Sequence, residues 1–144
     1  MAKEKITKAQ LTGRVAGAVV FVLTSYGVQQ LFFKKDMEKE LKKVVLEVNK
    51  NVPMAVDEYT QLDSASSIGK ANLTYYFSLF DLDKSEVNLD TVNKYLRPSI
   101  IENVKNNPDV KILRDNNITL DYLYYDKNGV FVLEISVGPD LYRN

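Results

Sequence analysis

The sequence predicts an α+β fold in which one N-terminal transmembrane helix is followed by a small antiparallel sheet with helices on one face. Three observations support this prediction. A nineteen-residue run near the N-terminus lacks charged residues, two later segments repeat apolar residues at helical spacing, and several segments alternate apolar and polar residues. After the run, the predicted order is helix, strand, strand, helix, strand, strand, which is typical of an α+β domain.

The uncharged run, residues 15–33, is predicted to be a membrane anchor because a helix of that length spans about 28 Å, close to the hydrocarbon core of a bilayer. We therefore predict a basic N-terminal tail over residues 1–14, the anchor over residues 15–33, and a soluble α+β domain over residues 34–144. A cleaved signal peptide is the alternative, because the tail is basic and Ser25 and Gly27 are small residues at the spacing of a cleavage site.

The orientation of the anchor is less strongly determined than its presence. Four basic residues precede it and five follow within ten residues, so the positive-inside count is nearly balanced. A short basic tail before a span is typical of a signal anchor, and we predict a single-pass protein with its domain on the periplasmic side of a bacterial inner membrane. The opposite orientation stays open. Gly13 and Gly17 lie four residues apart and are candidates for helix packing in the membrane.

The first half of the domain is predicted to contain a helix and two strands. Residues 36–49 form a helix with one apolar stripe, and Pro53 ends it. Residues 54–62 alternate loosely and are predicted to be a strand, followed by a Ser- and Gly-rich loop over residues 63–70. Residues 72–82 are rich in aromatic and β-branched side chains and form the next strand. One face of that strand carries four apolar side chains: Leu73, Tyr75, Phe77 and Leu79.

A second helix is predicted to follow, with Asp83 or Ser85 as its N-terminal cap and Pro98 as a break or kink. Its apolar residues keep helical spacing: Leu89, Val92, Leu96, Ile100 and Val104. A short helical turn is then predicted, with Asn107 as its N-cap and Pro108 as its first residue. Asn116 and Asn117 can end it, because asparagine tolerates a left-handed backbone.

The C-terminal segment is predicted to be a β-hairpin over residues 118–125 and 130–137. Asn128 and Gly129 between the strands favour a type I′ turn, in which both central residues take positive φ. That turn places three pairs on one face: Tyr124 opposite Leu133, Tyr122 opposite Ile135, and Leu120 opposite Val137. The turn and the alternation therefore predict the same register.

The other face of the predicted sheet is more apolar than contact with water requires. Five of its side chains are predicted to form a surface for a protein partner: Tyr76, Phe80, Leu123, Tyr125 and Val132. Cover by another segment of the chain is the alternative.

Composition and motifs argue against catalysis. The predicted domain carries 15 Lys and Arg against 18 Asp and Glu, so nucleic-acid binding is not expected. The chain has no Cys and no His, which removes thiolate nucleophiles, zinc–thiolate sites and the usual general base near neutral pH. Asp57 and Glu58 are adjacent, so on a strand they point to opposite faces. We predict that the protein is not an enzyme and has no catalytic residue, metal site or cofactor.

Three short segments carry a family resemblance: residues 52–57 (VPMAVD) followed by Thr60 and Leu62, residues 113–120 (LRDNNITL), and residues 124–129 (YYDKNG). Together they resemble small bacterial exported or membrane-anchored α+β domains of unassigned function. Members of that group tend to carry cysteines in this region, and this chain has none. Because the group has no assigned function, the resemblance implies no functional residues.

The sequence therefore predicts a non-catalytic interaction protein that is anchored in a membrane. Such a protein would be an accessory subunit, or an assembly or inhibitory factor, of a membrane-associated complex. The alternative is a binding module for a lipid, a peptide or another apolar ligand, which would use a tyrosine-rich groove between helix and sheet.

Overall fold

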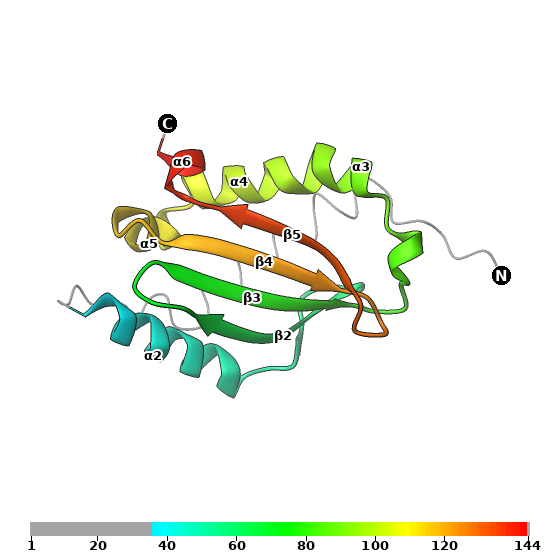
Figure 1. Cartoon of the computed structure of the whole chain (residues 1–144), viewed down its shortest axis with the longest axis horizontal. Helices are drawn as coiled ribbons and strands as arrows, with labels where there is room; N and C mark the ends of the chain where they lie inside the picture. The colour runs from blue at the N-terminus through cyan, green and yellow to red at the C-terminus, as the bar shows by residue number, and fades with distance from the viewer. Residues whose placement is uncertain (1–35, 144) are drawn as a thin grey trace.

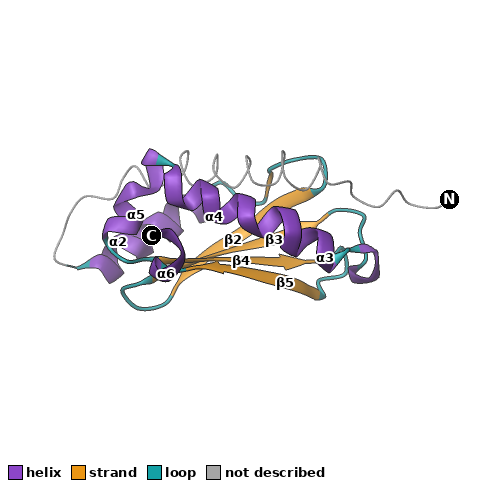
Figure 2. Ribbon diagram, turned by 90° about the horizontal axis from the view of Figure 1, so that it is seen from above, coloured by secondary structure: helices purple, strands orange, loops and turns teal. Residues whose placement is uncertain are grey.

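The computed structural model describes residues 36–143, which form a five-stranded sheet with helices packed against one face (Figure 1). Helices α4 and α5 lie on one side of the strands, and the described part of the chain places no long helix on the other side (Figure 2). The predicted tail, the predicted anchor over residues 15–33, and Gly13 and Gly17 lie outside the described residues. Within residues 36–143, no helix has the length and hydrophobicity needed to cross a membrane.

The strands lie in the order β1-β2-β3-β4-β5 across the sheet. Their bounds are Met54–Ala55 for β1, Thr60–Ser67 for β2, Asn72–Leu79 for β3, Thr119–Tyr125 for β4 and Phe131–Val137 for β5. The predicted α+β class is confirmed, but the prediction of an antiparallel sheet is wrong at its centre, where β3 and β4 are parallel. The helices between these two strands carry the chain back across the sheet, so β4 starts at the same end as β3.

Helix α2 (Met37–Lys50) confirms the first predicted helix. The Asp36 carboxylate caps it by accepting a hydrogen bond from the Lys39 backbone N–H at 3.2 Å. Three residues of its apolar stripe are fully buried: Leu41, Val44 and Val48. Asn49 then ties α2 to the sheet, because its side chain donates to the Ala65 carbonyl and accepts from the Ala65 N–H. These two hydrogen bonds satisfy backbone groups of β2 on the side away from β3.

The second helix is continuous through Pro98, which the sequence predicted to be a break or kink. It comprises α3 (Leu89–Thr91), a π-helical turn η4 (Val92–Leu96) and α4 (Arg97–Asn106). A proline removes one N–H donor and its ring crowds the carbonyl four residues earlier, and the wider π turn just before it accommodates both effects. The predicted caps are also wrong, because Asn88 caps this helix by accepting from the Thr91 N–H at 3.1 Å. Asp83 instead precedes a separate 3₁₀ turn, η3 (Lys84–Glu86).

The remaining helical segments pack at the end of the sheet where β4 begins. The turn η5 (Pro108–Val110) and helix α5 (Lys111–Asp115) occupy the predicted positions, and Asn117 has a φ of 58° beyond them. The Arg114 guanidinium donates to the carbonyls of Val104 and Asn107 at 2.7 and 2.6 Å, which joins α5 to the end of α4. The last helix, α6 (Pro139–Tyr142), was not predicted from the sequence, and the Tyr142 hydroxyl anchors it by donating to the Ile118 carbonyl at 2.8 Å.

Strand β2 corrects the predicted loop over residues 63–70. The strand runs to Ser67 and pairs with β3 along its length, with an irregularity at Asp63. Thr60, Leu62 and Ala65 are its buried residues, and the intervening residues are polar. After Leu62 the strand offers one small apolar residue, Ala65, among polar residues, so it has little hydrophobic periodicity, which explains why composition indicated a loop.

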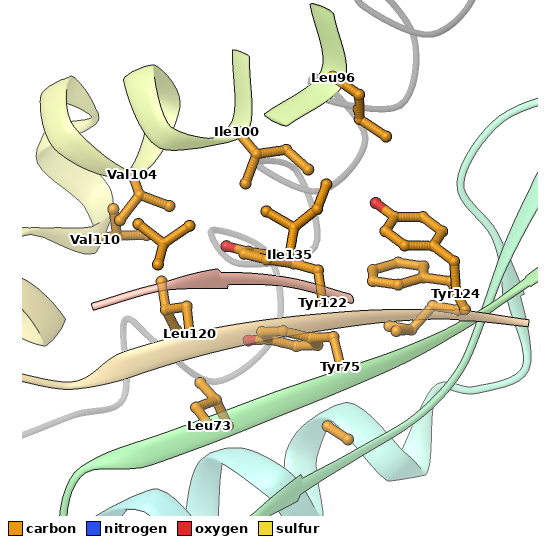
Figure 3. Packing of buried hydrophobic residues seen from close by; sticks show 14 of the residues in the cluster. Leu73, Tyr75, Leu96, Ile100, Val104, Val110, Leu120, Tyr122, Tyr124 and Ile135 are labelled. Carbon is orange, nitrogen blue, oxygen red and sulfur yellow. The ribbon is translucent and has the colours of Figure 1, made fainter. Parts of the chain in front are cut away.

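The core fills the layer between the sheet and the helices. The predicted face of β3 is confirmed, since Leu73, Tyr75, Phe77 and Leu79 are all buried. Figure 3 shows side chains from η4 and α4 pointing toward the sheet, where they pack over residues of β4 and β5. The labelled helix residues are Leu96, Ile100 and Val104, and the labelled sheet residues include Leu120, Tyr122, Tyr124 and Ile135.

Candidate interface on the open face of the sheet

The hairpin has the predicted register but a different turn. Tyr124, Tyr122 and Leu120 lie opposite Leu133, Ile135 and Val137, as predicted. The connection nevertheless spans the five residues 126–130, and only Gly129 among them has positive φ, at 78°. The type I′ prediction is therefore wrong, because that turn requires positive φ at Asn128 as well.

Asp126 explains the longer turn. Its carboxylate accepts hydrogen bonds from the backbone N–H groups of Asn128 and Val130 at 2.8 and 2.9 Å, and from Lys84 at 3.0 Å. An aspartate that binds the backbone of its own turn competes with the two-residue hairpin geometry. The hydrogen bond from Val130, together with those from Lys84 and Asn128, lowers the pKa of the Asp126 carboxyl below its ordinary value.

The longer turn introduces a bulge that exchanges two side chains between the faces of β5. Tyr125 lies opposite Phe131 and not opposite Val132, because the register shifts between Tyr124 and Tyr125. Val132 is 5% exposed and belongs to the core, so its prediction as a surface residue is wrong. Phe131 is 44% exposed and was missed, because the bulge depends on the Asp126 hydrogen bonds and not on the alternation.

The face of the sheet opposite the helices, called the open face below, consists of three rows across β2 to β5. The paired registers place these rows as Gln61, Ser78, Tyr125 and Phe131; Ser64, Tyr76, Leu123 and Glu134; and Ser66, Thr74, Asp121 and Ser136. The first two rows contain a contiguous apolar surface, the aromatic patch, made of Tyr76, Leu123, Tyr125 and Phe131. Three of the five predicted surface residues therefore lie together.

The rings of the aromatic patch contact one another. The Tyr76 and Tyr125 rings stack with centroids 6.5 Å apart, and the Phe131 ring meets Tyr125 edge-on at 5.9 Å. The Tyr76 hydroxyl hydrogen-bonds with the Ser66 hydroxyl at 3.0 Å. Phe80, the remaining predicted residue, is half-buried just beyond the end of β3, where its backbone N–H donates to the Tyr59 carbonyl at 2.7 Å.

Carboxylates surround the aromatic patch. Asp121 accepts hydrogen bonds from the Asn72 amide and the Ser136 hydroxyl, each at 2.5 Å. Asp63 accepts from the Gln61 amide at 2.8 Å and from the Ser78 hydroxyl. Glu134 lies directly opposite Leu123 and is exposed. The five strands contain no Lys or Arg, so the open face is acidic.

The core face holds a second group of tyrosines with a different environment. The hydroxyls of Tyr75, Tyr122 and Tyr124 are buried and have no hydrogen-bond partner among the described residues. The Tyr75 and Tyr122 rings stack with centroids 6.0 Å apart (Figure 3). The Tyr124 ring stacks on that of Phe77 at 5.1 Å. Burial raises the pKa of all three hydroxyls well above the ordinary value, so they stay neutral hydrogen-bond donors.

The two adjacent carboxylates that were considered as catalytic candidates, Asp57 and Glu58, do not point into a common site. Asp57 sits in a tight turn, where its carboxylate accepts from the Tyr59 N–H at 2.7 Å, while the neighbouring Glu58 is exposed. Within residues 36–143, no cluster of His, Cys, Asp and Glu has the arrangement to hold a metal ion. The open face therefore offers apolar contact, ring stacking and negative charge.

A family model described as "Domain of unknown function (DUF8479)" matches residues 33–133, which include α2, all of the sheet except the end of β5, and the helices between β3 and β4. The chain belongs to this family. The expected resemblance to small domains of unassigned function is confirmed at that level. No curated protein matches the sequence.

Three solved bacterial structures are similar to this fold. A Pseudomonas aeruginosa protein that is predicted to be secreted is 19% identical, with a TM-score of 0.62 over 77% of this chain and 98% of the other. The type II secretion system pilotin AspS from Vibrio cholerae is 11% identical, with a TM-score of 0.55 over 73% and 91%. The type 2 secretion system pilotin EpsS from Vibrio vulnificus is 8% identical, with a TM-score of 0.54 over 73% and 90%. At these identities the similarity concerns the fold.

Proposed function

We propose that this protein is a non-catalytic interaction domain, anchored in a membrane, that acts as an accessory, assembly or inhibitory factor of a membrane-associated complex. The observation that carries the proposal is the aromatic patch on the open face. A cluster of stacked rings at the surface of a sheet is costly to leave in water, and it is typical of sites where another protein docks.

Two further observations support a role at the cell envelope. The nineteen uncharged residues before the domain have the length of a membrane span. The similar folds include a protein predicted to be secreted and two pilotins of type II secretion systems, which fits an accessory domain outside the cytoplasm. These observations support the proposal that the domain lies on the extracytoplasmic side of a bacterial inner membrane.

Co-purification from the native membrane tests the proposal. The full chain, extracted in detergent, should retain a partner that is lost when Tyr76 and Tyr125 are both replaced by Glu. The matched control is Leu46→Glu, because Leu46 is 63% exposed on α2 and lies away from the open face. Equal recovery of the partner with the double variant and with the control would show that the open face is not the docking surface.

A binding module for an apolar ligand is the second candidate, and the three buried tyrosine hydroxyls favour it. Buried hydroxyls normally have hydrogen-bond partners, and a bound ligand with acceptor groups would supply them. Native mass spectrometry of the detergent-extracted full chain should then show an added mass, and a Tyr75→Phe, Tyr122→Phe variant should lose it. An unliganded mass in the wild-type protein would contradict this candidate.

A further inference from the structure

The open face carries three carboxylates whose charge is not balanced on that face. Among the residues that the structure describes, Asp63 and Asp121 accept hydrogen bonds only from neutral amide and hydroxyl groups, and neither they nor Glu134 form an ion pair. Arg97 approaches β5 from α4, but its guanidinium donates to the Glu134 backbone carbonyl at 3.2 Å. The aromatic patch is therefore bordered by three negative charges.

The three carboxylates lie close to the side chains of the aromatic patch. Glu134 shares a row with Tyr76 and Leu123, so its Cβ lies about 5 Å from that of Leu123. Asp121 lies two residues from Leu123 along β4, which is about 7 Å. Asp63 hydrogen-bonds to Ser78, which pairs with Tyr125. Each carboxylate is thus within one side-chain length of the apolar patch.

The three negative charges favour some kinds of partner for the open face and disfavour others. A second copy of the chain would bring three carboxylates against three others, and like charges at an interface are unfavourable. An anionic lipid surface or a nucleic acid would be repelled for the same reason. A protein segment with Lys or Arg between apolar residues would instead pair with the carboxylates, and its cations would be attracted to the faces of the tyrosine and phenylalanine rings.

We propose that the open face binds a basic, apolar segment of a partner protein, whose Lys or Arg side chains pair with Asp63, Asp121 and Glu134 while its apolar side chains cover the aromatic patch. This inference rests on the proposed function and adds the chemistry of the partner. Binding of such a segment would depend on both the three carboxylates and the rings of the aromatic patch, and substitutions can remove either group without the other.

Selection from a random library of 12-residue peptides, displayed on phage and challenged with the detergent-extracted full chain, tests the inference. The selected peptides should be enriched in Lys or Arg together with apolar residues. Their affinity should fall about tenfold in the triple variant Asp63→Asn, Asp121→Asn, Glu134→Gln, since each exposed charge pair makes a modest contribution and three pairs are lost together. The loss should shrink at high salt, because screening weakens the pairs in the wild type.

A matched triple variant controls for net charge. Glu38→Gln, Glu47→Gln and Glu102→Gln remove three carboxylates from the helices and should leave the affinity within about twofold. Selected peptides without basic residues, or equal losses in the two triple variants, would overturn the inference. If such neutral peptides still lost binding with Tyr125→Glu, the open face would remain the docking surface and only the partner chemistry would be wrong. Binding insensitive to Tyr125→Glu would overturn both proposals.

Discussion

The two faces of the same sheet use tyrosine in opposite ways. Tyr75 and Tyr76 are adjacent on β3, and Tyr124 and Tyr125 are adjacent on β4, so strand geometry sends one of each pair to each face. The core-face rings are fully buried, and their hydroxyls have no hydrogen-bond partner within residues 36–143. The open-face rings instead stack at the surface, where Tyr76 hydrogen-bonds to Ser66. The comparison shows that residue type alone does not distinguish a core from a docking surface.

Replacing one tyrosine on each face by alanine should give the largest difference in unfolding free energy between the two faces. Tyr122→Ala should cost about 3 to 5 kcal/mol of unfolding free energy, because it leaves a cavity among fully buried neighbours. Tyr125→Ala should cost less than about 1 kcal/mol, because the ring is half-buried at the surface. Urea denaturation of both variants measures the difference, and similar losses would mean that the open face is packed against another part of the chain.

The bulge in β5 can be tested by placing a charge on each side of it. Val132→Asp should cost about 3 kcal/mol or more, because Val132 is in the core. Phe131→Asp should change the unfolding free energy by less than about 1 kcal/mol, because residue 131 faces solvent. If the two effects were reversed, β5 would have the register of a type I′ hairpin, and Val132 would belong to the open face.

Replacing one tyrosine on each face by phenylalanine tests how much each hydroxyl contributes to stability. Tyr122→Phe should be neutral or stabilise by up to about 1 kcal/mol, because it deletes a buried polar atom that has no partner in the described part of the chain. Tyr76→Phe should cost about 0.5 kcal/mol through loss of the hydrogen bond to Ser66. Thermal denaturation of the two variants provides the measurement. A clear destabilisation by Tyr122→Phe would reveal a partner for its hydroxyl and favour a bound ligand.

Replacing Asp126 by Asn should have the smallest effect on stability, and that effect should depend on pH. Its folded-state pKa is lowered, so it contributes stability above its unfolded pKa of about 3.9, and this contribution is lost as pH falls through the folded value. The stability difference between the wild type and Asp126→Asn should therefore narrow below about pH 4. The exposed Asp90→Asn variant serves as the control. A difference that stays constant to low pH would mean that backbone hydrogen bonds do not lower this pKa.

Much of the fold was predictable because local patterns agreed with it. The apolar stripe of α2, the buried face of β3 and the three cross-strand pairs of the hairpin follow from helical and strand periodicity, and all are confirmed. The part of strand β2 beyond Leu62 was missed because Ala65 is its only apolar residue and the others are polar. The parallel pairing of β3 with β4 was missed because periodicity carries no information on strand direction.

The candidate site was predictable only in part. Tyr76, Leu123 and Tyr125 follow from alternation and lie together as predicted. Val132 was assigned to the wrong face and Phe131 was missed, because the bulge depends on three hydrogen bonds to one carboxylate. One of these comes from Lys84, which is 42 residues away in the chain.

The sequence by itself determined which residues can be helix or strand, which strand positions are apolar, and the absence of histidine and cysteine chemistry, because these depend on composition and on spacing along the chain. Tertiary structure alone decided which face of the sheet the helices cover, and it brought three carboxylates from β2, β4 and β5 around one aromatic patch. Contacts between distant segments make those choices, since burial of apolar surface and satisfaction of backbone hydrogen bonds are properties of the whole fold.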